Sequence, residues 1–479
     1  MKKRCRISAW IVTFFLFCAG STLGVAAADA GNPILSQINA LSLHEAGITG
    51  TYPDGTPVRV VVIDTGIDYC HPAFTDESGN TVVSPLSYNA TTDQIVAESD
   101  YTVLNDQPRA SNHGTMVCGT IASQLPNARG VAPDCELIVI KADIHNNQGA
   151  EEFDSEDLIR GLTYAVSLHP APAVINISWT ITSHDKNADA IAQLLKQARE
   201  QNILVCVAAG NDHTAHLLPP ANDPNVFCVG AVDDKNEKTN YSNFGPAIDV
   251  VAPGNVVAVR AGGGMINTRG TSFASPIVAG IAALYIGMHP GADVEETERM
   301  LRMTADDLGT IGRDDLYGYG LANAAAACFS QPFPITLVCE DSSASYEYYP
   351  GYDWLCSFEP DVGEGKLVGW FLDPAFTQRV TADTVLTEGA TLYAGVRYEW
   401  ILEEGCVVTA TLTDYPGTAL TYPEKPGFTY FTEDEMPAVL GRKNVRVRLF
   451  WILDDIDVIR GPQNVEAGAG AGQGTLTFD

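Results

Sequence analysis

The chain has 479 residues, 46% of them hydrophobic and 18% charged. This composition is typical of a globular protein and excludes an intrinsically disordered chain, and the length is sufficient for more than one domain. The formal net charge of −31 disfavours nucleic acid and anionic membranes as partners, because both are negatively charged. The charge leaves the type of reaction open.

Residues 1–28 have the three-part layout of a secretory signal peptide. Basic residues near the start precede an apolar tract centred on Trp10–Ala19, and small residues follow at Ala26–Ala28. We therefore expect export to a secreted or cell-surface location, with cleavage after Ala28 or Ala30. The tract is short for a membrane span, and we expect no later apolar run to be long enough to span a bilayer, and so no membrane insertion.

From Val58 to about Ala326, short β-branched runs alternate with amphipathic stretches such as the predicted helix Ala188–Ala198. The predicted strands are Val58–Ile63, Leu137–Lys141, Val174–Ile177, Ile203–Ala208, Val226–Val232 and Ile248–Ala252. Apolar strands in such an alternation predict an α/β fold, with a mainly parallel sheet covered by helices on both faces. Functional residues are then expected at the carboxyl ends of the strands.

An acidic cluster precedes one predicted helix and consists of Glu151, Glu152, Asp154, Glu156 and Asp157. We interpret it as a solvated helix start and not as a metal site, because apolar residues follow at helical spacing.

Eleven cysteines are present, and two of them, Cys5 and Cys18, lie in the signal peptide. The odd number that remains leaves at least one cysteine unpaired within a monomer. None has the CxxC spacing of a zinc site. Cys206 and Cys228 lie in apolar predicted strands, where we expect them to be small buried hydrophobic residues.

Three short phrases, VVVIDTGID, NHGTMVCGT and RGTSFASPIVAG, place Asp64, His113 and Ser272 in the order acid, base and nucleophile. A serine hydroxyl needs a base within hydrogen-bond reach, and an imidazole has a suitable pKa. A carboxylate on the other ring nitrogen fixes the tautomer and stabilises the imidazolium. Each phrase alone is weak evidence, but the three in this order separate one triad lineage from the others. An aspartic protease is disfavoured, because no second DTG or DSG is present to share a proton with Asp64.

At these residues the chain resembles the subtilisin-like serine protease (subtilase) family, over roughly Ile34–Phe329. The resemblance implies a subtilisin-like α/β fold and a secreted serine endopeptidase that acts through an acyl-enzyme on proteins or peptides. It implies that Ser272 is the nucleophile, His113 the general base and then acid, and Asp64 the orienting carboxylate.

The residues after the nucleophile predict a helix over Phe273–Ile286 that begins at Ser272. We expect Pro276 to be tolerated because it falls in the first turn of this helix. The positive end of the helix then points toward the site where negative charge develops.

The phrase ILVCVAAGND resembles the oxyanion-hole segment of the family. The resemblance implies that Asn211 donates its side-chain amide to the oxyanion, with the Ser272 backbone N–H as the second donor. The alternative is a loop asparagine that caps a turn.

The resemblance places Ser178, Trp179, Thr180 and Gly210 at the substrate-binding cleft, where backbone pairs with an extended peptide. The family usually has glycine where Thr180 stands, so we expect a narrower pocket for the residue before the scissile bond. Asp212 attracts a basic side chain at the rim in one interpretation and is a solvated loop carboxylate in the other.

The chemistry requires no cofactor, and no metal ligands are identified. The family's tight calcium site uses an aspartate after the DTGID-xx-HP phrase, but Ala73 stands at that position here. We therefore expect this site to be absent, whereas weaker calcium sites stay open. We also expect no folding propeptide, because ILSQINALSLHEAGITG, which resembles the start of a mature domain, follows Ala30 closely.

The predicted segments are a signal peptide at 1–28, a catalytic domain at 31–330, a β-rich module at 334–412, and residues 413–479, of unassigned role with a disordered end. Within the module, Leu367–Val396 resembles an internalin B-type repeat, which implies a β-grasp-like structure that contacts the cell surface. Its aromatic residues are interpreted as module core and not as a carbohydrate platform: Trp370, Phe371, Tyr393 and Tyr398.

Three functional hypotheses follow. The first is a secreted endopeptidase, the second a catalytically silent protease-like binding or adhesion protein, and the third a processing protease of narrow specificity. The complete set of Asp64, His113, Asn211 and Ser272 favours an active enzyme over a silent one.

Overall fold

The computed structural model describes residues 31–76, 78–96, 101–105, 112–142, 144–145, 151–152, 154–310, 312–330, 332–339, 342–348, 366–380, 384, 386, 388–397, 451–453 and 456–458. The predicted signal peptide, Tyr398 and most of the segment 413–479 lie outside these residues.

The larger unit is built on an eight-stranded sheet with the strand order β10-β9-β8-β7-β1-β4-β2-β3. The strands are β1 (Arg59–Asp64), β2 (Tyr88–Asn89), β3 (Gln94–Ile95), β4 (Glu136–Lys141), β7 (Val174–Ile177), β8 (Leu204–Ala208), β9 (Phe227–Val232) and β10 (Val250–Pro253). All neighbours pair in parallel except β2 and β3. The predicted parallel sheet is confirmed, and each predicted strand is found with its ends shifted by two residues or fewer.

Successive residues of the central strands enter two different cores. In β1, Val60 and Val62 belong to the core on one face of the sheet, whereas Val61 and Ile63 belong to the core on the other face. Side chains of a strand alternate between faces, so a sheet that is covered on both sides needs apolar residues at every position. This explains the continuous apolar runs that predicted the strands.

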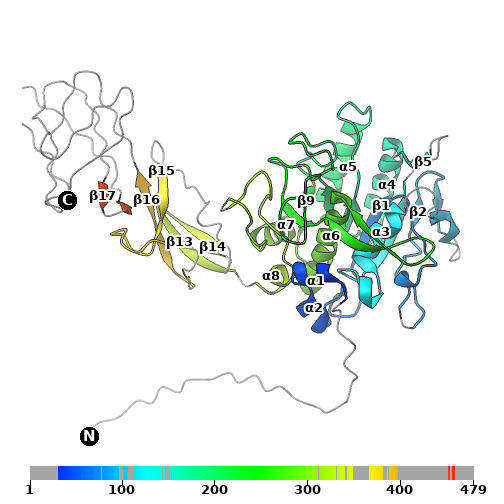
Figure 1. The fold of residues 1–479 in the computed structure, drawn as a ribbon, viewed down its shortest axis with the longest axis horizontal. Coiled ribbons are helices and arrows are strands. Elements are labelled where there is room, and N and C mark those ends of the chain that lie inside the picture. Colours follow the sequence, from blue (N-terminus) through cyan, green and yellow to red (C-terminus); the bar gives the residue numbers. More distant parts are fainter. Residues whose placement is uncertain are drawn as a thin grey trace, which may run out of the picture.

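Helices cover both faces of this sheet (Figure 1). One face carries α1 (Pro33–Gln37), α2 (Leu41–Glu45), α3 (His113–Ala122), α6 (Thr271–Met288), α7 (Val294–Met303) and α8 (Ala324–Phe329), and the other carries α4 (Ser155–Ser167) and α5 (Ala188–Glu200). Short elements complete this unit: η1 (Pro72–Phe74), η2 (Tyr101–Leu104), η3 (Pro126–Ala128), and the antiparallel pairs β5 (Ile144–His145) with β6 (Glu151–Glu152) and β11 (Asn255–Val259) with β12 (Met265–Arg269).

Helix α6 is long and apolar enough to cross a membrane by length and composition, contrary to our expectation for the region after the signal peptide. Of its 18 residues, however, 89% are buried inside the protein. A helix that is apolar all round is typical of a protein core as well as of a membrane span. The burial of α6 therefore accounts for its composition.

The acidic cluster before α4 is only partly a solvated helix start. Its first two glutamates form β6, and Asp154 caps the first turn of α4. Asp157 is fully buried, where it accepts a hydrogen bond from the Thr91 hydroxyl at 2.8 Å and pairs with Arg160. A neighbouring cation and a hydroxyl thus replace the expected solvent around this carboxylate.

The predicted burial of two cysteines is confirmed. Cys206 of β8 and Cys228 of β9 are buried with free thiols, whereas Cys70 is exposed. Cys356 and Cys406 lie outside the described residues.

A second, four-stranded sheet follows the larger unit, with the order β14-β13-β16-β15 (Figure 1). Its strands are β13 (Phe333–Cys339), β14 (Ser342–Tyr348), β15 (Lys366–Phe371) and β16 (Thr391–Arg397), and a further hairpin joins β17 (Trp451–Leu453) to β18 (Ile456–Val458). Trp370 and Phe371 are 2% and 1% exposed, which confirms the interpretation of these two aromatic residues as module core. The β-grasp-like nature of the module stays a prediction.

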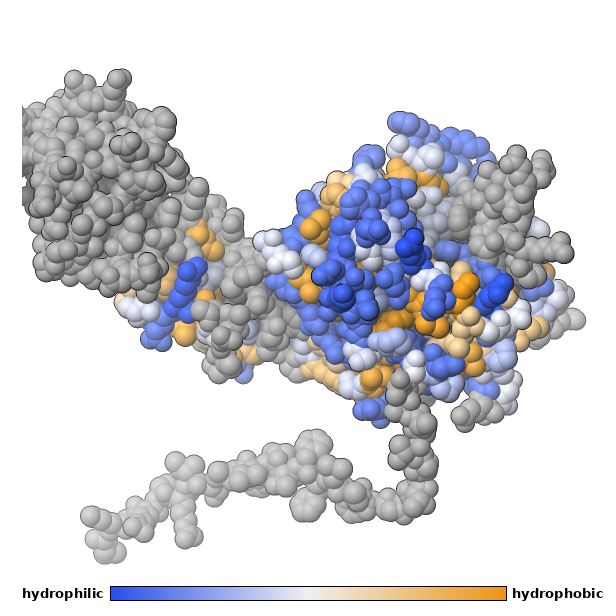
Figure 2. All heavy atoms as spheres, in the orientation of Figure 1, coloured by the Kyte–Doolittle hydropathy of each residue, from blue (hydrophilic) through white to orange (hydrophobic). Residues whose placement is uncertain are grey.

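The second sheet contacts the larger unit at the end of α7. Met303 packs against the core of the module, and Arg299 pairs with Glu347 of β14 at 2.9 Å. Figure 2 shows that hydrophilic residues cover much of one face of the larger unit, with apolar residues between them.

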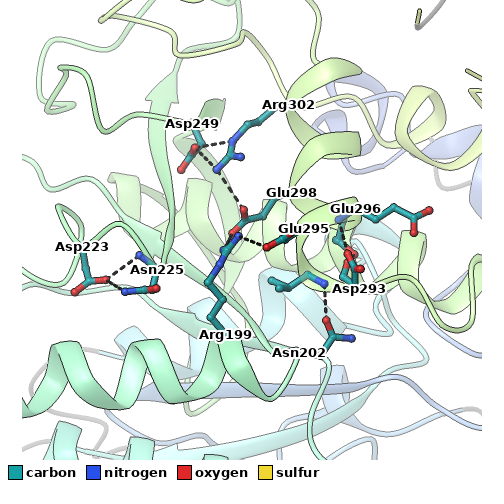
Figure 3. Close-up of polar contacts among 12 residues, drawn as sticks. Arg199, Asn202, Asp223, Asn225, Asp249, Asp293, Glu295, Glu296, Glu298 and Arg302 are labelled. Atoms are coloured by element: carbon teal, nitrogen blue, oxygen red, sulfur yellow. Dashed lines mark hydrogen bonds and ion pairs between the residues drawn. The ribbon is translucent and has the colours of Figure 1, made fainter. Parts of the chain in front are cut away.

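An ion-pair cluster joins α7 to α5 and to the sheet (Figure 3). Glu298 is buried and lies 2.6 Å from Arg199 of α5 and 3.5 Å from Arg302. Arg302 in turn contacts Asp249, directly before β10, at 2.8 Å. Burial raises the pKa of Asp249, and the nearby Arg302 opposes that rise.

Candidate active site

The carboxylate of Asp64 and the imidazole of His113 are in direct contact. Asp64 is the last residue of β1 and is fully buried, and His113 is the first residue of α3. The distance from Asp64 Oδ1 to His113 Nδ1 is 2.7 Å. Because the carboxylate accepts a hydrogen bond from Nδ1–H, the neutral imidazole carries its lone pair on Nε2.

Gly66 and Gly114 allow the segments that carry Asp64 and His113 to come this close. The Gly114 N–H donates to Thr65 Oγ1 at 2.8 Å, so the first turn of α3 lies on the turn that follows β1. A Cβ atom at Gly114 would lie 2.2 Å from the carbonyl oxygen of Gly66. Only glycine permits this separation, which brings together residues 49 positions apart.

Ser272 lies in the first turn of α6, next in the chain to a residue that approaches His113. The ring of the next residue, Phe273, is 6.0 Å from the His113 ring. Ser272 is 9% exposed, and its hydroxyl donates to the carbonyl oxygen of Ser178 at 3.1 Å. The start of α6 is also the positive end of an 18-residue helix, which favours negative charge near Ser272.

The structure corrects the expected position of Pro276. Helix α6 begins at Thr271, so the proline lies in the second turn and not in the first. Proline has no N–H, and the carbonyl of the residue four positions earlier, Ser272, therefore lacks its helical partner. The Ser178 hydroxyl donates to that carbonyl at 2.9 Å instead.

Asn211 follows the carboxyl end of β8 and reaches the start of α6. Its Oδ1 accepts from the Thr271 N–H at 2.9 Å and from the Thr271 hydroxyl at 3.2 Å. A backbone N–H can only donate, so the amide oxygen must face α6 and the amide NH₂ must point elsewhere. This contact spans 60 residues and joins the loop after β8 to the first turn of α6.

Comparison with known proteins identifies the family. Residues 55–320 match the family model described as the subtilase family (Peptidase_S8). The chain belongs to the subtilase family. It is a subtilisin-like serine endopeptidase, and its substrates are proteins or peptides.

Several curated relatives share this similarity. Subtilisin E of Bacillus subtilis (strain 168) and Subtilisin NAT of Bacillus subtilis subsp. natto are each 34% identical over 301 residues, which is 61% of this chain and 70% of each relative. Subtilisin of Bacillus pumilus is 34% identical, with 97% of it covered. A solved lanthipeptide protease aligns with 61% of this chain and 93% of its own, at 25% identity and a TM-score of 0.49.

Of the four residues predicted at the cleft of this subtilase, Ser178 contacts Ser272 directly. Trp179 is 6% exposed, and its indole N–H donates to the carbonyl oxygen of Ile63 at 3.1 Å, so its side chain is part of the core. Thr180 and Gly210 are partly exposed. Trp179 can therefore offer only its backbone to a substrate.

Asn243 shapes the loop that carries Asn211, and no sequence motif indicated it. It is 1% exposed, and its Oδ1 accepts from the N–H groups of Asp212 and Thr214 at 2.9 and 3.1 Å. A Cβ atom at Gly210, where φ is +99°, would lie 2.4 Å from Asn243 Nδ2. The loop therefore depends on a buried amide 32 residues beyond Asn211, which has no spacing pattern to reveal it.

Within the described part of the chain, no group of three or more His, Cys, Asp or Glu residues could hold a metal ion. Calcium is also bound by backbone and amide oxygens, so the result leaves weaker calcium sites open. The expectations about calcium therefore stay predictions.

Proposed function

We propose that Ser272 is the nucleophile of this subtilase, His113 its general base and then acid, and Asp64 the carboxylate that orients the imidazole. The observation that carries the proposal is the 2.7 Å contact between Asp64 Oδ1 and His113 Nδ1 beside the start of α6. This contact holds the imidazole in the tautomer whose Nε2 can accept a proton.

In the first half of the reaction, the Ser272 hydroxyl leaves the Ser178 carbonyl and turns toward His113 Nε2. Its oxygen attacks the substrate carbonyl carbon while Nε2 takes the proton, and a tetrahedral oxyanion forms. The C–N bond then breaks, and the imidazolium gives its proton to the leaving amine. An acyl-enzyme ester on Ser272 remains.

In the second half, water attacks the ester while His113 Nε2 takes a proton from it. The ester bond breaks as this proton passes to Ser272 Oγ, which restores the hydroxyl and releases the carboxylic acid. Asp64 stays ionised throughout and stabilises the imidazolium in both halves.

Two donors stabilise the oxyanion in this proposal, the Asn211 side-chain amide and the Ser272 backbone N–H. The orientation of the Asn211 amide supports its part, because Thr271 already occupies the amide oxygen and the NH₂ remains the donor. Preorganised donors of this kind stabilise charge that exists only in the transition state.

For substrate binding, we infer that the backbone of residues 178–180 and of Gly210 pairs with an extended peptide. The side chain of Thr180, which stands where the family usually has glycine, narrows the pocket for the residue before the scissile bond. We further propose that the enzyme is exported through its N-terminal segment and that the second sheet contacts the cell surface.

A fluorophosphonate probe tests the proposal, because it labels only an activated serine. We expect the mature protein to be labelled at neutral pH and Ser272→Ala to lose all labelling, while Ser87→Ala, a buried serine outside β7 and α6, keeps it. Labelling that persists in Ser272→Ala would refute the assignment of the nucleophile.

Hydrolysis assays test the two other functional hypotheses against the secreted endopeptidase. A folded protein that is inactive on casein and peptides at neutral pH would favour the silent binding protein. A peptide library cleaved at one motif only would favour the processing protease of narrow specificity.

A further inference from the structure

A chain of hydrogen bonds runs through three buried polar side chains of the β7 and α6 regions and ends at the Ser272 carbonyl. Asn176, Ser178 and Ser275 are each 3% exposed or less. Ser275 Oγ donates to Asn176 Oδ1 at 2.7 Å, Asn176 Nδ2 donates to Ser178 Oγ at 2.9 Å, and Ser178 Oγ donates to the Ser272 carbonyl at 2.9 Å. We call these three side chains the relay.

The direction of every hydrogen bond in the relay follows from its last acceptor. The Ser272 carbonyl can only accept, so the single hydroxyl proton of Ser178 must point at it. Ser178 Oγ must then accept from Asn176, which places the amide NH₂ toward Ser178 and the amide oxygen toward Ser275. The relay therefore has one arrangement of protons, and the carbonyl at its end is always satisfied.

Pro276 explains why this carbonyl needs a donor from outside the helix. In a regular helix the N–H of residue 276 would donate to the Ser272 carbonyl, and the proline removes that N–H. A buried carbonyl without a partner is unfavourable, and the peptide group could rotate to find another donor. The Ser178 hydroxyl provides the missing donor within the native geometry.

We propose that Ser178 is a positioning residue for the nucleophile, through its side chain, and that Asn176 and Ser275 hold it in place. The proposal rests on the role of Ser272 given above. The relay holds the peptide group between Ser272 and Phe273, and with it the direction of the Ser272 side chain relative to His113. A second bond, from the Ser272 hydroxyl to the Ser178 carbonyl, joins the same two residues in the opposite sense.

This function differs from the one that the family resemblance implies for Ser178, which concerns its backbone at the substrate cleft. The relay side chains are buried and contact the backbone of the nucleophile. We therefore expect their loss to affect the chemical step more than substrate binding. Small displacements of a reacting group lower the rate strongly. A loss in kcat with little change in KM is therefore its expected signature.

The first experiment compares Ser178→Ala and Ser275→Ala with Ser87→Ala in the full chain. Ser87 is also a buried serine, whose hydroxyl accepts from the Val139 N–H at 2.9 Å outside the relay. We expect kcat on a peptide substrate to fall about tenfold in Ser178→Ala and about threefold in Ser275→Ala, as for loss of one hydrogen bond, with KM within about twofold. Unchanged kcat in Ser178→Ala, or an equal loss in Ser87→Ala, would overturn the proposal.

The second experiment restores the helical donor. Pro276→Ala returns a backbone N–H to the position that can donate to the Ser272 carbonyl. We expect kcat of the double variant Ser178→Ala/Pro276→Ala to lie within about twofold of Pro276→Ala alone, so the two substitutions are not additive. Independent losses that multiply in the double variant would contradict the proposal, because a merely structural Ser178 predicts no rescue.

The outcomes separate the two proposals. If Ser272→Ala abolishes probe labelling but Ser178→Ala is labelled at the wild-type rate, the nucleophile stands and the relay is refuted. If Ser272→Ala is still labelled, the proposed function itself fails. Circular dichroism checks that each variant folds, and if Ser178→Ala does not fold, Ser275→Ala and its double variant with Pro276→Ala decide by the same criterion.

Discussion

Two asparagines beside the start of α6 have opposite surroundings. Asn211 is exposed and its amide oxygen is occupied by Thr271, whereas Asn243 is 1% exposed and its amide oxygen accepts from two backbone N–H groups of the same loop. The exposed amide can meet a substrate, and the buried one holds the loop in shape. In the proposed mechanism the first amide acts in catalysis, and the second holds the geometry on which catalysis depends.

At the residue scale, we expect Asn211→Ala to lower kcat by about 10²–10³-fold with little change in KM, the range known for the corresponding donor of subtilisin. The donor stabilises charge that is present only in the transition state, so substrate binding is spared. Steady-state kinetics on a peptide substrate measure this effect.

Asn211→Asp is the matched control, because it keeps an oxygen that can accept from the Thr271 N–H but has no donor. We expect it to be at least as impaired as Asn211→Ala, since it places a negative charge beside the oxyanion. If Asn211→Asp regained activity, the side chain would act through its contact with Thr271 and not as a donor.

At the element scale, the ion-pair cluster of Figure 3 joins α7 to α5 and to the sheet, beside the apolar residues of α7 in the core. Glu298 is 4% exposed and lies between Arg199 and Arg302, which are 25% and 28% exposed. Removing the carboxylate leaves both cations without this partner in a partly buried site. The cluster lies at the end of the sheet where β10 begins, whereas Asp64 lies at the carboxyl end of β1.

We expect Glu298→Ala to lower the free energy of unfolding by about 3 kcal/mol, as for breaking a buried ion pair, while kcat of the folded enzyme is unchanged. Urea unfolding of the variant in a Ser272→Ala background measures the loss without self-digestion. Glu347→Ala is the control, because its pair with Arg299 is about half exposed and should contribute less than about 1 kcal/mol. Equal losses in the two variants would contradict this account of α7.

The thiols in β8 and β9 make the stability of the sheet depend on pH. Burial raises the pKa of Cys206 and of Cys228 above that of an exposed thiol. The folded protein then keeps protons that the unfolded chain loses, so this stability is complete below the unfolded thiol pKa of about 8.5 and falls as the pH rises above it. The loss is at most about 1.4 kcal/mol per pH unit for each thiol.

We therefore expect the free energy of unfolding, measured with urea between pH 7.5 and pH 10, to fall less steeply in Cys206→Ala/Cys228→Ala than in the parent. Ser272→Ala is again the background. Cys70→Ala should leave the slope unchanged, because that residue is exposed in the folded state. An unchanged slope in the double variant would show that other groups cause the pH dependence.

At the scale of the whole molecule, the two sheets are separate hydrophobic units. The larger unit has its own cores on both faces of the eight-stranded sheet, and the module has a third core around Trp370 and Leu392. In the described part of the chain, the contacts named above between them are Met303 against the module core and the half-exposed pair of Arg299 with Glu347. Because each unit has its own core, we expect each to fold without the other.

We expect a chain that ends at residue 330 to fold and to keep kcat/KM on a short peptide within about twofold of the full-length enzyme. Circular dichroism and peptide hydrolysis of the two chains measure this. A truncated chain that does not fold, or that loses most of its activity, would show that the module is part of the catalytic unit. The same result would argue against the predicted domain boundary near residue 330.

The sequence alone was sufficient for the parallel sheet and for the pairing of Asp64 with His113. A sheet that is buried on both faces requires apolar residues at every position, and such runs are visible without any knowledge of contacts. The three phrases and their order resemble those of the subtilase family, and that resemblance implied that Asp64 orients His113. Both signals are visible along the chain before any contact is known.

Only the tertiary structure decided which side chains support that site and the fold around it. The donor for the Ser272 carbonyl, the buried amide of Asn243, the burial of Asp157 and the partners of Glu298 all depend on contacts between residues far apart in the chain. The residue type of a serine, an asparagine or a glutamate does not show whether solvent or a buried partner makes the hydrogen bonds of its side chain. Its role is set by which donor or acceptor folding brings next to it, because polar groups removed from water must find partners inside the protein.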